Sequence, residues 1–316
     1  MRTAIIDGVY EIMKKNKNSY FLTGDLGYNT LEKIEKDFGN RFINIGVAEQ
    51  NMIGIASGLA LTGKKVFCYS IIPFLTMRCF EQIRNDICYH DLDVTLLGSG
   101  SGLTYGILGS THFALEDLAI LRPLPNMTIF SPADEMDARL GIRYSANFHH
   151  PLYIRIGLRK EAKIHQQPYD FKFGKGVVIQ KGKDLVFFVT GTLMEEVIKA
   201  AKIIQKEKKL TSTIIDIHTI KPLDKELILK EVQGKKIAIT VEEHGKIGGL
   251  GSAVTETLSE SRKPVRVIRI GTIDQFVKVI GTRSYLRKQL GLDAEGIIKK
   301  IKYQSIYENK KKMIKL

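Results

Sequence analysis

The sequence predicts an α/β protein with two domains, each built on a mainly parallel sheet flanked by helices. Short β-rich runs alternate with helical patterns along most of the chain, as expected for repeated β–α units. A polar segment rich in lysine and glutamine, residues 157–183, lacks periodicity and separates two such series. The 316 residues are enough for two domains of ordinary size. We therefore place one domain at 1–165, a linker at 166–179 and a second domain at 180–316.

The predicted strands of the first domain are short runs of apolar, β-branched and aromatic residues. They are Tyr20–Thr23, Phe42–Ile45, Val66–Tyr69, Val94–Gly98, Met127–Phe130 and Leu152–Ile156. The predicted helices between them are Met52–Leu61, Phe80–Cys88 and Asp134–Ser145. Gly63 is expected to end the first of these helices, because glycine adopts the left-handed conformation of a C-cap. Asp134 is expected to cap the third, because its carboxylate accepts hydrogen bonds from free backbone N–H groups.

The second domain repeats the alternation of strands and helices. Its predicted strands are Leu185–Thr190, Thr213–Ile217, Lys236–Val241 and Val265–Ile270. Its predicted helices are Met194–Lys206, Leu223–Glu231 and Leu250–Ser259. Strands joined by helical crossovers run parallel in one sheet, with helices covering both faces.

The composition is that of a globular protein outside the membrane. Hydrophobic residues make up 44% and charged residues 26% of the chain. No apolar run approaches the ~20 residues that a bilayer span needs. An acid and several lysines interrupt the N-terminal apolar runs, so this end is not a signal peptide. The three cysteines have no metal-type spacing, and their odd number argues against a disulfide framework, so we expect a cytoplasmic protein.

The net charge of +14 does not by itself indicate nucleic-acid binding. The lysines are spread along the chain and are not interleaved with aromatic residues that would stack on bases. Solvated helix faces explain them, and we expect neither a nucleic-acid nor a membrane partner.

Glu49 is the most informative residue of the sequence. Residues 44–60, NIGVAEQNMIGIASGLA, place it at the entry to an apolar helix, after a turn that Gly46 allows. The helix dipole alone favours an acid in the first turn. The small residues of the helix also let another backbone approach closely, while its isoleucines and leucine desolvate the entrance. A carboxylate in such surroundings has its protonation tuned, as in many active sites.

Residues 44–60 resemble the pyrimidine-binding domain of transketolase and its relatives. The resemblance implies a thiamine-diphosphate enzyme in which Glu49 hydrogen-bonds the ring nitrogen of the aminopyrimidine and activates the cofactor. It also implies that residues 1–165 form the pyrimidine-binding domain. Phe74 lies in a segment that resembles the one whose aromatic residue packs on the pyrimidine. Asp25, in TGDLG, matches a family aspartate near the cofactor and the domain interface.

His112 and its neighbours resemble two further transketolase elements. Residues 109–112 are GSTH, and residues 121–127 are LRPLPNM, similar to the G-x-T-H and L-R-x-x-P-N-M patterns. The resemblance implies that His112 contacts sugar hydroxyls or moves protons. The family's long enzymes carry an acid before the first pattern and a glutamine after it, where this chain has Leu108 and Phe113. Because loss of a hydroxyl-binding acid changes substrate selection, a ketose other than the usual pentose phosphates is an open alternative.

Arg155 and Arg2 match family arginines that bind the substrate phosphate. Arg155 ends a predicted strand, where α/β sheets place ligand groups, and a planar guanidinium suits phosphate. The C-terminal half is also similar to transketolases: residues 240–244, TVEEH, and 248–254, GGLGSAV, resemble the signature of the transketolase C-terminal domain. A glycine-rich turn after a strand also occurs in nucleotide-binding loops, which leaves that weaker alternative open.

The metal-binding motif of the long enzymes, Gly-Asp-Gly followed by Asn, does not occur in this sequence. We therefore expect no metal ligands here. The resemblance implies that an N-terminal-section subunit supplies the diphosphate site and the Mg²⁺ ligands, in an α2β2 heterotetramer acting on sugar phosphates. The predicted reaction moves a two-carbon ketol unit from a ketose phosphate to an aldose. The alternatives are a 2-oxo acid dehydrogenase β subunit, a 1-deoxyxylulose-5-phosphate synthase-like enzyme and a non-catalytic regulatory subunit.

Overall fold

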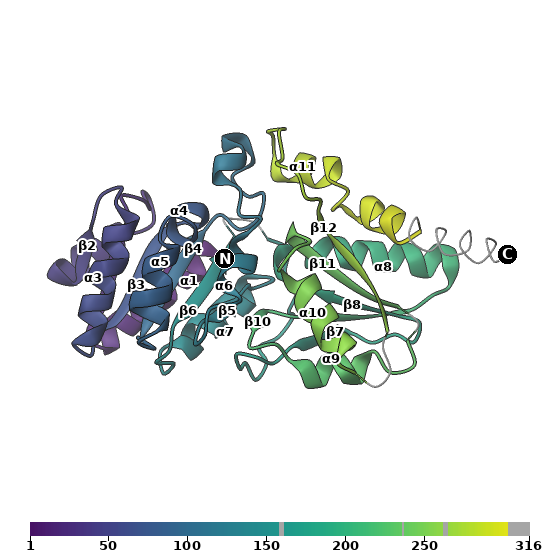
Figure 1. Ribbon diagram of the computed structural model, residues 1–316, viewed down its shortest axis with the longest axis horizontal. Helices are drawn as coiled ribbons and strands as arrows, with labels where there is room; N and C mark the ends of the chain where they lie inside the picture. Colours follow the sequence, from purple (N-terminus) through teal and green to yellow (C-terminus); the bar gives the residue numbers. More distant parts are fainter. Residues whose placement is uncertain (158–160, 236, 262–264, 303–316) are drawn as a thin grey trace.

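The computed structural model describes residues 1–157, 161–235, 237–261 and 265–302. Two α/β lobes lie side by side, the N-terminal one purple to teal and the C-terminal one green to yellow (Figure 1). This arrangement confirms the predicted fold class. Within the described ranges, no helix combines the length and apolar character that a bilayer crossing requires.

The first sheet has seven strands in the order β10-β5-β6-β4-β3-β1-β2, and every neighbouring pair is parallel except β10 with β5. Its strands are β1 (Ser19–Thr23), β2 (Phe42–Asn44), β3 (Lys65–Ile71), β4 (Val94–Ser99), β5 (Thr128–Phe130), β6 (Leu152–Ile156) and β10 (Thr219–Lys221). The main helices of this lobe are α1 (Arg2–Lys15), α2 (Glu32–Phe38), α3 (Glu49–Leu61), α4 (Ile72–Thr76), α5 (Phe80–Gln82), α6 (Asp117–Leu121) and α7 (Glu135–Ser145).

The second sheet has five strands in the order β12-β11-β8-β9-β7, parallel except for the edge pair β7 and β9. Its strands are β7 (Val177–Gln180), β8 (Leu185–Val189), β9 (Ser212–Asp216), β11 (Ile237–Gly245) and β12 (Arg266–Thr272). Its helices include α8 (Met194–Lys208), α9 (Lys225–Glu231), α10 (Leu250–Ser259) and α11 (Arg283–Gln289), and residues 294–302 are also helical.

The two predicted helix ends are confirmed. Gly63 follows α3 with φ +80°, and its N–H donates to Ala60 O over 2.9 Å. Asp134 precedes α7, and its side chain accepts from Asp137 N over 3.0 Å. The predicted helix over Phe80–Cys88 begins as α5 and continues as a π-helical segment, Ile83–Cys88.

Several elements differ from the prediction. β10 belongs to the second half of the chain but extends the first sheet, and a three-residue strand leaves too short a pattern to recognise. β7 begins inside the predicted linker, because a half-buried edge strand shows no apolar alternation. Helices α1, α2, α4, α6 and α11 were not predicted. Lys236 and residues 303–316, parts of a predicted strand and of the predicted second domain, lie outside the described ranges.

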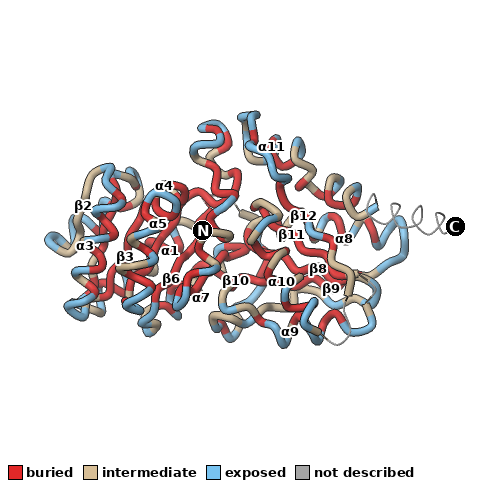
Figure 2. The backbone as a smooth tube through the Cα atoms, in the orientation of Figure 1, coloured by how far each residue is buried: buried red, intermediate tan, exposed pale blue. Residues whose placement is uncertain are grey.

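One apolar core cluster contains residues of both lobes. Leu118 and Leu121 of α6 pack in the same cluster as Leu250 and Val254 of α10. Buried segments, drawn red, lie on both sides of the junction (Figure 2). Lys221 Nζ, on β10, donates to Arg122 O over 2.9 Å, and Arg122 pairs with the carboxylate of Glu256 at 2.6 Å. The relative position of the two sheets is therefore held by packing and by charge-assisted bonds.

Candidate active site

Glu49 begins α3 and lies beside the carboxyl ends of β1 and β3. Its side chain is 2% exposed. Oε1 accepts from Ser70 Oγ on β3 over 2.9 Å, and Oε2 accepts from Arg78 Nη1 over 2.5 Å. Gly24 packs against this carboxylate, and a Cβ there would lie in ordinary van der Waals contact, 3.4 Å from Oε1. The predicted acid is therefore buried and held at both oxygens.

Phe74 and His112 come together next to this carboxylate. The Arg78 guanidinium lies over the Phe74 ring, 4.6 Å from its centre. The Phe74 and His112 rings meet edge to face with centroids 5.2 Å apart. His112 Nδ1 also lies 2.9 Å from Thr111 Oγ1. Contacts thus connect Glu49, Arg78, Phe74 and His112 into one cluster, which we call the acid–aromatic cluster.

Tyr105 continues the cluster toward β4. Its ring lies 6.2 Å from that of His112, and its hydroxyl lies 3.1 Å from Ser99 Oγ. Burial raises the pKa of Tyr105, while the Arg2 charge acts in the opposite direction. Arg2, at the start of α1, therefore lies close enough to Tyr105 to influence this edge of the site.

Asp25 orders the loop after β1 rather than entering the cluster. It has φ +56° and is exposed. Asn44 Nδ2 donates to Asp25 Oδ1 over 3.0 Å, and Asp25 N donates to Asn44 Oδ1 over 3.0 Å. These two bonds fix the ends of β1 and β2 immediately beside Glu49.

Arg155, which is expected to bind the substrate phosphate, has a side chain that is 3% exposed. Nε donates to Asp117 Oδ2 over 2.7 Å, and Nη2 donates to Asp117 Oδ1 and Glu243 O, each over 3.1 Å. Tyr153 Oη donates to the same carboxylate over 2.7 Å. Arg155 thus forms a buried ion pair with Asp117 and also bonds the second domain, and its phosphate-binding role stays a prediction.

The two residues that differ from the pattern of the long enzymes, Leu108 and Phe113, lie in different surroundings. Leu108 is 48% exposed, so an apolar side chain stands where those enzymes carry an acid. Phe113 is buried and packs in a core cluster with Leu103 and Leu115. Leu108 is therefore the more exposed departure, near His112, whereas Phe113 packs in the core and also lines a hollow at the lobe junction.

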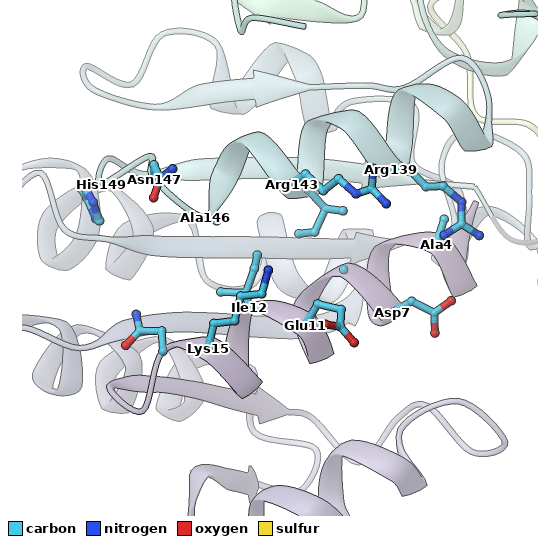
Figure 3. Close-up of a pocket in the computed structure, with 13 residues that line it drawn as sticks. Ala4, Asp7, Glu11, Ile12, Lys15, Arg139, Arg143, Ala146, Asn147 and His149 are labelled. Atoms are coloured by element: carbon cyan, nitrogen blue, oxygen red, sulfur yellow. The ribbon is translucent and has the colours of Figure 1, made fainter. Parts of the chain in front are cut away.

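A hollow of about 750 Å³ at the lobe junction flanks the acid–aromatic cluster. Pro73 and Thr111, neighbours of Phe74 and His112, line it from the first lobe, and Phe276 lines it from the second. A separate groove of about 820 Å³ lies between α1 and α7, lined by charges of both signs (Figure 3). That groove contains no member of the cluster.

Among the described residues, one group of acids and histidine has metal-ligand spacing: Asp134, Asp137 and His165. His165 Nδ1 lies 3.2 Å from Asp134 Oδ1, and its Nε2 lies 3.6 Å from Asp216 Oδ2. Asp134 already accepts from the backbone N–H groups of residues 137, 164 and 165. Burial, and then the charge of Asp137, raises the pKa of Asp216 well above its usual range. His165 lies beside Asp137 on α7 and Asp216 on β9, so this group lies where the two lobes meet.

Arg78 and Ser70 are the site residues that sequence reasoning missed. Arg78 lies in the turn that follows α4, and no local pattern in the sequence links it to Glu49. Ser70 carried no signal either, because a serine in an apolar strand does not reveal which carboxylate it meets.

Together these residues can hold a planar polar heterocycle. A buried acid exchanges a proton with a ring nitrogen, an aromatic side chain covers a ring face, and an imidazole accepts or donates a second proton. The fold and site thus define a two-domain α/β protein with a proton-handling site at the carboxyl ends of a parallel sheet.

Residues 1–160 match the family model of the transketolase pyrimidine-binding domain, and residues 174–297 match that of the transketolase C-terminal domain. The chain belongs to the transketolase family.

Similar proteins resemble this chain over nearly its full length. A Methanocaldococcus jannaschii protein, provisionally named a transketolase C-terminal section, is 38% identical and covers 95% of each chain. An Actinobacillus succinogenes protein, named as one subunit of an apulose-4-phosphate transketolase, is 36% identical over 83% of this chain and 84% of that protein. A solved split-gene transketolase, described as an inactive β4 tetramer, is 35% identical with a TM-score of 0.87, covering 96% of this chain and 97% of the other.

Proposed function

We propose that this chain is the C-terminal subunit of a split, thiamine-diphosphate-dependent transketolase of the cytoplasm. It moves a two-carbon ketol unit from a ketose phosphate to an aldose or aldose phosphate. The observation that carries the proposal is the burial of Glu49 against Ser70 and Arg78, beside the Phe74 ring. Similarity to proteins named as transketolase sections and subunits supports it.

The residues present suit the aminopyrimidine half of the cofactor. Glu49 would hold the proton at the ring nitrogen, and Phe74 would cover a ring face. Thiamine diphosphate, when bound, supplies the electron sink that ketol transfer requires. His112, at the edge of Phe74, would donate and accept protons at the oxygens of the sugar.

The proposal assigns the diphosphate and Mg²⁺ ligands to an N-terminal-section subunit, in an α2β2 heterotetramer. The described group with metal-ligand spacing lies at the lobe junction, where Asp134 accepts hydrogen bonds from the backbone N–H groups of Ile164 and His165. In the order of the strands, this group lies away from Glu49. Large apolar side chains lie exposed around the 750 Å³ hollow and its neighbouring loops, a pattern typical of surfaces that a partner covers. They are Ile107 (72% exposed), Ile247 (66%), Phe276 (81%) and Ile280 (62%).

Leu108 bears on the choice of sugar. An apolar residue gives a sugar hydroxyl no hydrogen bond, so a donor that needs an acid at this position is held poorly. We propose a ketose phosphate other than the usual pentose phosphates. The apulose-4-phosphate named for the A. succinogenes relative is an example of the class to test.

The proposal is tested by mixing this chain with its candidate N-terminal-section partner. We expect ketol transfer from a panel of ketose phosphates, with Mg²⁺ and thiamine diphosphate, only when both chains are present. A 2-oxo acid with an artificial electron acceptor should give no turnover, and pyruvate should not be required. Oxidation of the 2-oxo acid would instead indicate a 2-oxo acid dehydrogenase β subunit. Condensation that depends on pyruvate would indicate a 1-deoxyxylulose-5-phosphate synthase-like enzyme.

A further inference from the structure

Arg78 is the solvent-side partner of Glu49. Its side chain is 40% exposed, whereas that of Glu49 is 2% exposed. The other partner of the carboxylate, Ser70, is buried. A molecule that reaches Glu49 from solvent therefore meets the oxygen that Arg78 holds, and not the one that Ser70 holds.

The contact between Arg78 and Glu49 is a charge-assisted hydrogen bond. Hydrogen bonds between ionised partners are shorter and about twice as strong as neutral ones. Arg78 Nη1 lies 2.5 Å from Glu49 Oε2. Stacking over Phe74, at 4.6 Å, adds a second contact that keeps the guanidinium in place. Both residues that the proposed function assigns to the pyrimidine are thus in contact with Arg78.

We propose that Arg78 competes with the cofactor's pyrimidine for Glu49 and Phe74. The inference rests on the proposed function, in which those two residues bind the pyrimidine. Arg78 is then a positioning residue: it acts through Glu49 and controls how fast the carboxylate becomes available. A released guanidinium can turn toward water at little cost, because its side chain is long and already partly exposed.

The alternative is that Arg78 stays on Glu49 throughout the reaction as a structural ion pair. Competition predicts that removing Arg78 accelerates cofactor binding. A structural pair predicts that removing it leaves binding unchanged or slows it, because the carboxylate loses its support. The association rate therefore separates the two.

The experiment measures thiamine diphosphate association, with saturating Mg²⁺, to the complex of this chain with its partner. Stopped-flow spectroscopy follows the signal of the bound cofactor, independently of turnover. Arg78→Met keeps the apolar stem over Phe74 and removes the ion pair, and it is expected to raise the association rate about tenfold, the equivalent of one hydrogen bond to a charged group. Arg78→Lys restores the charge and should return the rate toward that of wild type. Arg84→Met, at an exposed arginine bonded to Asn85, is the matched control.

A second measurement on the chain alone guards against misfolded variants. Arg78→Met should lower the Tm of the wild-type chain but leave that of a Glu49→Gln chain nearly unchanged, because the pair is already broken there. Equal association rates for wild type and Arg78→Met, with binding intact, would overturn this inference alone. Failure of the wild-type complex to bind the cofactor would overturn the proposed function, and this inference with it.

Discussion

Glu49→Gln in the assembled complex is expected to reduce kcat for ketol transfer by roughly 10³-fold or more, the upper part of the range for a positioned acid or base. Glutamine is nearly isosteric and keeps the hydrogen bond to Ser70, so the fold around the site should persist. It cannot hold or release the proton that the ring nitrogen requires. Steady-state kinetics with saturating thiamine diphosphate measure the loss.

Glu81→Gln is the control for this substitution. Glu81 is an exposed acid on α5 that contacts Gln82 and takes no part in the acid–aromatic cluster. Its replacement should leave kcat within about twofold of wild type, as for most surface changes. Retention of full activity by Glu49→Gln would show that another group activates the cofactor, and the catalytic assignment would fail.

Arg155→Met is expected to destabilise the chain by about 3–5 kcal/mol, because it leaves Asp117 charged and buried without its partner. The same change removes the bond from Nη2 to Glu243 O across the lobe junction. Urea unfolding monitored by circular dichroism gives the free energy directly. This structural role differs from the phosphate-binding role that sequence resemblance implied for this arginine.

Arg139→Met provides the comparison for Arg155→Met. Arg139 pairs with Glu135 at 2.6 Å on the surface of α7, with 42% of its side chain exposed, and such pairs contribute about 0.5 kcal/mol. A variant Arg155→Met that unfolds like wild type but shows a raised KM for sugar phosphates would restore the phosphate-binding role. Loss of stability with an unchanged KM would support the structural one.

Sequence patterns predicted the parts of the fold that depend on local periodicity. Long buried strands such as β4 and β6, and the caps at Gly63 and Asp134, follow from residue types within a few positions. Strand β10 did not, because its pairing with β5 depends on residues far away in the chain. Local patterns carry no information about which distant strand completes a sheet edge.

The candidate site was likewise predicted only in part. The resemblance named Glu49, Phe74 and His112, and the structure brings these residues into one cluster. Arg155 carried an equally good pattern, a cation at a strand end. Arg155 forms an ion pair with Asp117, which lies on a different element, and sequence spacing cannot reveal such a neighbour. Arg78 was missed for the converse reason, since its partner Glu49 lies 29 positions away.

The most direct measurement of the central claim is thiamine diphosphate binding to this chain with and without its N-terminal-section partner. Isothermal titration with Mg²⁺ should give no resolvable binding to the chain alone and a saturable isotherm for the complex. Each half of the cofactor then has its ligands on a different chain. Tight, Mg²⁺-dependent binding by the chain alone would contradict the shared site and place the diphosphate ligands within these 316 residues.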